Sequence, residues 1–134
     1  MRTVSIVIPV FNEQDSLSLF LDAARPALAD ALALIGPGAQ AEYLFVDDGS
    51  TDRTADVLAI LSRLNSDVRC ITLSRNFGKE AALAAGIDHA RGDAVIPIDV
   101  DLQDPPAVIV EMVRHWLAGA QVVNARRVDR STDS

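Results

Sequence analysis

The chain has 134 residues, of which 49% are hydrophobic and 23% are charged, and its formal net charge at pH 7 is −7. This length and composition predict one folded domain with a single core and exclude a disordered chain. The acidic charge argues against a nucleic-acid-binding surface, which needs a basic patch, and the single cysteine excludes an internal disulfide.

The first residues carry no recognisable targeting signal. The apolar run within "MRTVSIVIPVF" is too short to span a membrane, and it lacks a small-residue cleavage site. We therefore expect a protein that is made and kept in the cytoplasm.

The first half of the chain predicts two strands, each followed by a helix. The nearly continuous β-branched run "VSIVIPV" (4–10) is typical of a strand covered on both faces. We expect Asn12 to cap the next helix, Pro26 to bend or interrupt it, and the "GPG" at 36–38 to end it. A second strand over 42–49 runs into a turn and is followed by an amphipathic helix.

The second half continues the alternation with a third strand over 68–74. An alanine-rich helix follows, ends near Gly92, and has small side chains that favour close packing against a sheet. In the fourth strand, "AVIPID" (94–99), Pro97 cannot donate a ladder hydrogen bond and predicts a bulge or a sheet edge.

A last helix is predicted with Asp104 as its cap and Pro105 in its first turn, and residues 120–126 are a candidate fifth strand. Strands that alternate with helices over short links predict an α/β fold. We expect a mainly parallel sheet with helices on both faces.

In open parallel sheets, ligands bind at the carboxyl ends of the strands. In this sequence the predicted strands are apolar, whereas polar or charged groups follow four of them. These groups are Pro9 to Glu13, Asp47 and Asp48, Ser74 to Lys79, and Asp99 to Asp104.

The stretch "VIPIDVDLQDPP" places Asp99 and Asp101 one residue apart after a strand. If the chain stays extended, both carboxylates project to the same side. Two hard oxygen donors suit Mg²⁺ or Mn²⁺, which take further ligands from a diphosphate. A solvated loop is the alternative, and Asp104 is explained equally well as a helix cap.

The stretch "VDDGSTD" also follows a strand. A tight turn at Gly49, with Ser50 or Asp52 capping the next helix, explains its second half. It explains less well why Asp47 and Asp48 are adjacent, since neighbouring carboxylates repel. One of them is a candidate acceptor of hydrogen bonds from a base or a ribose.

Basic groups lie near the end of the third predicted strand. Arg75 and Lys79 are placed to meet phosphate, and ion pairing with the nearby aspartates is an equal alternative. His89 and His115 lie on predicted helices without a partner at ligand spacing, so we expect both to be structural or exposed.

Four stretches together resemble the N-terminal half of family 2 glycosyltransferases with the GT-A fold. The resemblance is to the polyprenyl-phosphate branch, which includes dolichol-phosphate mannose synthases and bacterial undecaprenyl-phosphate glucosyltransferases. The stretches are "VSIVIPVFNEQDSL", "YLFVDDGSTDRTADVL", "LSRNFGKEAALAAGIDHARGDAVIPIDVDLQDPP" and "VVNARRVDR". The resemblance implies a truncated Rossmann-like nucleotide-diphospho-sugar transferase domain over residues 1–126 and a polar tail over 127–134.

The resemblance also implies roles for individual residues. A nucleotide pocket would be lined by Pro9, Phe11 and Glu13, with tyrosine more common in the family at the Phe11 position. Val46 and Asp48 match positions that contact the base. Asp99, Asp101 and Gln103 match the site for Mg²⁺ or Mn²⁺ and the diphosphate. Arg127 and Arg130 fall where the family has basic residues for the acceptor phosphate.

The chemistry that the resemblance implies is the transfer of a sugar from a UDP- or GDP-linked donor to a polyprenyl phosphate. A lipid phosphate oxygen would attack the anomeric carbon with inversion, and the metal would neutralise the departing diphosphate. The acceptor phosphate is already an anion, so basic residues would be needed to bring it close to the anionic donor.

Other functions compete with this hypothesis. The family continues with acceptor-side strands, an amphipathic helix and often membrane spans, so a non-catalytic nucleotide-sugar-binding module or a subunit is the second hypothesis. The exposed sheet edge of this chain would favour self-association. A companion membrane subunit is a further possible partner. A phosphoryl-transfer protein of the response-regulator or haloacid-dehalogenase type is the third, disfavoured because Gln103 stands where a dehalogenase has Thr or Val.

Overall fold

The computed structural model describes residues 2–101 and 107–119 of the chain. Several predictions fall on other residues and lie outside the described part. These are the roles of Gln103, Asp104, Pro105, Arg127 and Arg130, the fifth strand at 120–126, and the domain boundary at residue 126.

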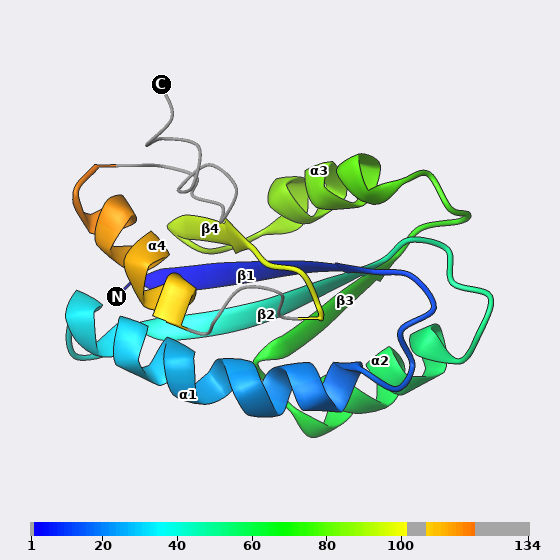
Figure 1. Ribbon diagram of the computed structural model, residues 1–134, viewed down its shortest axis with the longest axis horizontal. Coiled ribbons are helices and arrows are strands. Elements are labelled where there is room, and N and C mark those ends of the chain that lie inside the picture. Colours follow the sequence, from blue (N-terminus) through cyan, green and yellow to red (C-terminus); the bar gives the residue numbers. More distant parts are fainter. Residues whose placement is uncertain (1, 102–106, 120–134) are drawn as a thin grey trace.

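Four parallel strands form one sheet (Figure 1). They are β1 (Thr3–Val10), β2 (Gln40–Asp47), β3 (Val68–Thr72) and β4 (Ala94–Pro97), and their order is β3-β2-β1-β4. The chain moves outward from β1 to β3 and then crosses to β4 on the other side of β1. This reversal creates a switch point between β1 and β4, which is where open sheets of this kind hold ligands.

Helices cover both faces of the sheet, as predicted (Figure 1). On one face, α1 (Leu17–Ile35), α2 (Thr54–Leu64) and α4 (Ala107–Leu117) enclose the larger apolar cluster. Within it the rings of Phe20 and Phe45 meet edge to face, with centroids 5.9 Å apart. On the other face, α3 (Lys79–His89) covers a smaller cluster that includes Val7, Leu44 and Val46.

Helix α3 lies very close to the sheet because small residues face it. A Cβ atom on Gly86 would stand 2.4 Å from Val7 Cγ1 and 3.0 Å from Val46 Cγ2, closer than side chains pack. Ala82, one turn earlier, is also fully buried. The prediction that the alanine-rich helix packs closely is confirmed.

The predicted cap at Asn12 is wrong, and so is an interruption of α1 at Pro26, the second of the two effects expected there. Asn12 does not cap this helix, because α1 begins after Ser16 while Asn12 has a φ of 53° and contacts another loop. Pro26 does not interrupt α1, which runs unbroken past it. Pro26 and Asp22 are both exposed, so the carbonyl that loses its N–H partner faces water, and the buried face of α1 holds the helix in place.

Pro97 lies on β4, one of the two edge strands of the described sheet, which confirms the predicted edge position. The N–H of Ile98 donates to the carbonyl of Val7, so β4 bonds to β1 through alternate residues. The backbone nitrogen of Pro97, which carries no hydrogen, therefore faces away from β1.

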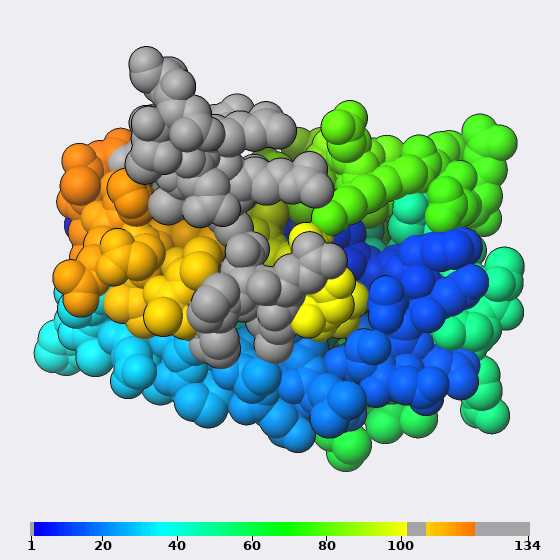
Figure 2. Space-filling view, in the orientation of Figure 1, coloured from blue at the N-terminus to red at the C-terminus, as the bar shows by residue number. Residues whose placement is uncertain are grey.

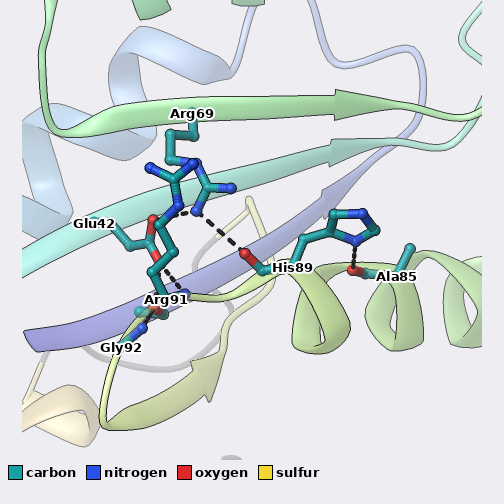
Figure 3. A network of polar contacts seen from close by, with 7 residues as sticks. Glu42, Arg69, Ala85, His89, Arg91 and Gly92 are labelled. Atoms are coloured by element: carbon teal, nitrogen blue, oxygen red, sulfur yellow. Dashed lines mark hydrogen bonds and ion pairs between the residues drawn. The ribbon is translucent and has the colours of Figure 1, made fainter.

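A buried carboxylate joins three strands at the end of the sheet opposite to the switch point (Figure 3). Glu42 on β2 is 8% exposed and accepts hydrogen bonds from Ser5 Oγ at 2.5 Å and from Arg69 Nη1 at 2.6 Å. It also accepts one from the backbone N–H of Arg91 at 2.7 Å, while the N–H of Gly92 donates to Ser5 Oγ at 2.8 Å. The network ties the connection between α3 and β4 to the sheet.

These contacts favour the ionised form of Glu42. Burial acts to raise the pKa of its carboxyl, but the hydrogen bonds from Ser5 and the Arg91 amide, with the hydrogen bond and charge of Arg69, outweigh burial and lower it. Because the pKa is lower in the folded chain than in the unfolded chain, Glu42 stabilises the fold above its unfolded pKa. This stabilisation is lost as the pH falls through the folded pKa.

We expect Glu42→Gln to reduce the free energy of unfolding at pH 7 by about 1–3 kcal/mol, because it leaves Arg69 and two donors without their anion. The difference from wild type should shrink as the pH falls through the lowered folded pKa of Glu42, where its carboxyl takes up a proton. Urea denaturation at pH 7 and pH 3 measures both values.

The matched control is Asp22→Asn on the exposed face of α1, which should change stability by less than about 0.5 kcal/mol at either pH. An equal effect of Glu42→Gln at both pH values would contradict the assigned ionisation.

Candidate functional site

A pocket of about 290 Å³ opens at the switch point between the carboxyl ends of β1 and β4. In Figure 2 the segment that follows β4, in yellow, lies beside the segment that follows β1, in blue. The lining residues also come from the end of β2 and the start of α3. They are Pro9, Val10, Phe11, Glu13, Asp48, Lys79, Asp99, Val100 and Asp101.

The lining of this pocket is strongly acidic. It contains the four carboxylates of Glu13, Asp48, Asp99 and Asp101, and Lys79 is the only cation among the described lining residues. The ammonium of Lys79 contacts a carboxylate oxygen of Asp99. Carboxylates this close repel one another, so the pocket favours cations.

The donor set of Asp99 and Asp101 fits a divalent cation that is shared with a ligand. Strand β4 ends at Pro97 and residues 100–101 form a turn, yet both acids line the pocket together with Val100 between them. Within residues 2–101 and 107–119, no three acidic, histidine or cysteine side chains group closely enough to hold a metal alone. Mg²⁺ and Mn²⁺ bound by one or two carboxylates take their remaining ligands from water and phosphate.

Asp48 lines the pocket and also shapes it. It is 4% exposed, and its Oδ1 and Oδ2 accept hydrogen bonds from the backbone N–H groups of Phe77 at 2.8 Å and Gly78 at 3.0 Å. The loop that leads into α3 is therefore held by the side chain of the residue that follows β2. This contact sets where α3 begins and so places Lys79 at the pocket.

The adjacent Asp47 has a different role. It is fully buried and does not line the pocket, and its Oδ1 accepts a hydrogen bond from the N–H of Ser50 at 3.0 Å. Within the described part of the chain, its Oδ2 has no hydrogen-bond partner. Of the two adjacent acids, only Asp48 is positioned to meet a bound molecule.

The turn after β2 packs directly on the loop before α3. Gly49 has a φ of 69°, and a Cβ there would lie 2.2 Å from the carbonyl carbon of Arg75 and 2.5 Å from the N atom of Asn76. Only glycine allows both this backbone conformation and this approach. The turn predicted at Gly49 is confirmed.

Asn12 joins the loop after β1 to the loop after β2. Its N–H donates to Ser50 Oγ at 2.9 Å, and its Oδ1 accepts from the N–H groups of Thr51 at 2.8 Å and Asp52 at 3.2 Å. The N–H of Glu13 donates to Thr54 Oγ1 at 2.9 Å. These bonds hold the rim that carries Phe11 and Glu13. No local pattern predicts this role of Asn12, because its partners lie about forty residues away.

The N-cap residue of α2 is Arg53 and not Ser50 or Asp52 as predicted, but Asp52 just before it still bonds to the first residue of the helix. Its Oδ1 accepts from the N–H of Thr54 at 2.8 Å and from Thr54 Oγ1 at 2.5 Å. Slight desolvation raises the pKa of Asp52, but these hydrogen bonds outweigh it and leave the pKa below its ordinary value.

Other residues of the predicted site lie away from the pocket. Val46 is fully buried on the face that α3 covers, and it does not line the pocket. The Arg75 guanidinium stacks on the ring of Phe77 at 4.6 Å from its centroid, also outside the pocket lining. His89 and His115 are exposed, as expected. Among the described helices, none is long and apolar enough to cross a membrane.

Comparison with known proteins adds to this geometry. Residues 5–134 match the family model described as glycosyl transferase family 2. The chain is 46% identical over 130 residues to a bactoprenol glucosyl transferase of Shigella phage SfV, an alignment covering 97% of this chain and 40% of that protein. It is 44% identical over 131 residues to an undecaprenyl-phosphate 4-deoxy-4-formamido-L-arabinose transferase of Edwardsiella ictaluri, covering 97% and 38%. The chain thus spans about two fifths of the length of these curated relatives.

Solved structures share the fold. A mannosyltransferase from Pyrobaculum calidifontis, in complex with GDP-Man and Mn²⁺, matches with a TM-score of 0.66 at 24% identity over 86% of this chain and 32% of that chain. Glucosyl-3-phosphoglycerate synthase from Mycobacterium tuberculosis, in complex with UDP, matches with a TM-score of 0.57 at 28% identity over 88% and 41%. The predicted GT-A fold is confirmed.

We expect Asn12→Ala to reduce the free energy of unfolding by about 2–4 kcal/mol, because it removes the acceptor for two amides and strains a left-handed backbone. Asn12→Gly removes the same acceptor without the strain, so it should cost about 1 kcal/mol less. Urea denaturation of the three chains separates the two effects. Equal stability of all three would contradict the assigned contacts.

We expect Asp48→Ala to speed amide hydrogen exchange at Phe77 and Gly78 by about 10- to 100-fold, since both N–H groups lose their buried acceptor. Asp48→Asn keeps one acceptor oxygen, so only one of the two amides should exchange at the Ala-variant rate. NMR-detected exchange measures each amide separately. Unchanged protection in Asp48→Ala would show that the loop does not depend on this carboxylate.

Proposed function

The chain belongs to glycosyl transferase family 2, and from this premise we propose that it forms the donor-binding part of an enzyme that transfers a sugar to a polyprenyl phosphate. The donor would be a UDP- or GDP-linked sugar. The observation that carries the proposal is the acidic pocket at the switch point, where Asp99, Asp101 and Lys79 meet. A nucleoside diphosphate and a divalent cation together match its charge and size.

The walls of the pocket suit the nucleoside. Pro9 and the half-exposed ring of Phe11 offer an apolar surface for a base, and each oxygen of Asp48 keeps a lone pair beyond its loop hydrogen bond. We assign the base to this side. A solved structure of the same fold is a complex with UDP, which supports a nucleoside diphosphate as the ligand.

The acidic end of the pocket suits the diphosphate. Asp99 and Asp101 would hold Mg²⁺ or Mn²⁺, with Gln103 as a proposed further ligand. When bound, the ion supplies Lewis acidity and neutralises charge on the departing diphosphate. Lys79, whose ammonium contacts Asp99, supplies a second positive charge in the same pocket. The fold relative with GDP-Man and Mn²⁺ supports a divalent ion in this fold, and Mn²⁺ is our first candidate.

The proposed reaction is a single inverting displacement. An oxygen of the acceptor phosphate forms a bond to the anomeric carbon of the sugar, and the bond from that carbon to the diphosphate breaks. The nucleoside diphosphate leaves with the electron pair. Since the acceptor oxygen is already anionic, the chain needs cations to bring two anions together, and we propose Arg127 and Arg130 for this task.

The chain spans only part of the length of its relatives, so we propose a division of roles along it. It covers about two fifths of their length, and we assign residues 1–126 to donor binding and 127–134 to the start of the acceptor side. A lipid acceptor would place the whole protein at the cytoplasmic face of a membrane. A non-catalytic nucleotide-sugar-binding module is the second candidate, because it would need only the donor pocket. The family match argues against the hypothesis of a phosphoryl-transfer protein.

We expect the purified chain to bind UDP or GDP only with Mn²⁺ present, as measured by calorimetry. Asp101→Asn should weaken this binding about tenfold or more, because it removes one of two charged metal ligands. Asp88→Asn, on the exposed side of α3, is the matched control and should bind like wild type. If a folded wild-type chain binds neither nucleotide, the donor site is not formed within these residues and the proposal fails.

A further inference from the structure

Lys79 has an unusual position in this chain. It is the only lysine among the 12 basic residues, and it is the only cation that the described residues place on the wall of the acidic pocket. Its ammonium contacts Asp99, one of the two acids of the proposed metal site. The side chains of both partners are partly exposed, at 51% and 36%, so each has room to move.

The fold, and not the side chain alone, places this ammonium. Asp48 holds the two amides just before α3, so Lys79 becomes the first residue of that helix. The N-terminus of a helix carries a partial positive charge, which disfavours a cation there unless an anion is close. Asp99 supplies that anion from the segment that follows β4. Lysine suits an exchangeable contact, because its ammonium is a mobile point charge on a flexible stem.

We propose that Lys79 acts as an internal cation that holds Asp99 in the donor-free chain and is transferred to the diphosphate when the metal binds. The inference rests on the proposed function, since it needs a divalent ion at Asp99 and Asp101. A divalent cation and an ammonium that share one carboxylate repel each other strongly at a separation of a few ångströms. The metal therefore displaces Lys79, and a diphosphate beside the metal offers the ammonium a new anion.

This exchange couples the two ligands. Lys79 competes with the metal for Asp99 when no nucleotide is present, so it weakens the binding of the metal alone. With the nucleotide present, the same ammonium contacts the diphosphate and strengthens binding. A residue with a purely structural role would not affect the two affinities in opposite directions.

The test compares the wild-type chain with Lys79→Gln and Lys79→Arg by calorimetry. We expect Lys79→Gln to bind Mn²⁺ alone about fivefold more tightly, as expected from losing one exposed ion pair. It should bind UDP or GDP in the presence of Mn²⁺ about tenfold more weakly, whereas Lys79→Arg should stay within about threefold of wild type in both. Unchanged or weaker binding of Mn²⁺ alone by Lys79→Gln overturns the inference.

A second measurement uses the single ε-amino group. The rate of acetylation at Lys79 by an amine-reactive ester can be followed by mass spectrometry, because the only other amine is the N-terminus. Mn²⁺ alone should speed labelling of Lys79, and Mn²⁺ with UDP or GDP should slow it below the rate of the donor-free chain. Slower labelling with Mn²⁺ alone overturns the transfer.

The two proposals can fail separately. Binding of Mn²⁺ without binding of either nucleotide overturns the proposed function, while the effect of Lys79→Gln on Mn²⁺ affinity still decides whether Lys79 and the metal compete. If nucleotide binding depends on Mn²⁺ but Lys79→Gln does not shift the affinities for Mn²⁺ and for the nucleotide in opposite directions, only the role given to Lys79 is overturned.

Discussion

The reversal of strand order beside β1 is the constraint on which the rest of this structure depends. Because crossover connections in parallel sheets are right-handed, moving outward to β3 puts α1 and α2 on one face, and crossing back to β4 puts α3 on the other. The loops after β1 and β4 therefore diverge to opposite faces and leave a crevice between them. Asp99, Asp101 and Lys79 meet there because of this topology.

Around the crevice, side chains of the loops satisfy backbone groups of neighbouring loops. Asn12 accepts from the loop after β2, and Asp48 accepts from the loop before α3. Three loops that start from different strands are thus joined into one rim by hydrogen bonds. Asp48 is part of this frame and also faces the pocket, so the same carboxylate organises the site and is available to a ligand.

The opposite end of the sheet has a polar network of a different kind. Ser5 pairs with Glu42 in the register of β1 and β2, whereas Val10 pairs with Asp47 at the end that carries the pocket. Glu42 is satisfied by three donors and bonds to an arginine, which is what a buried carboxylate needs in order to stabilise a fold. Stability and binding therefore depend on different acids at opposite ends of the same two strands.

The sequence by itself determined the local features of this protein. Apolar strands alternating with helices, the turn at Gly49, the small residues of α3 and the spacing of Asp99 and Asp101 all follow from neighbouring residues, and so did the family resemblance. Only the tertiary structure decided which acid does what. Asp47 turns the chain, Asp48 faces the pocket, Glu42 holds three strands, Val46 is buried beneath α3, and Pro26 is tolerated on an exposed helix face. The physical reason is distance along the chain: the partners of Asn12, Asp48 and Glu42 lie tens of residues away, so no local pattern encodes them.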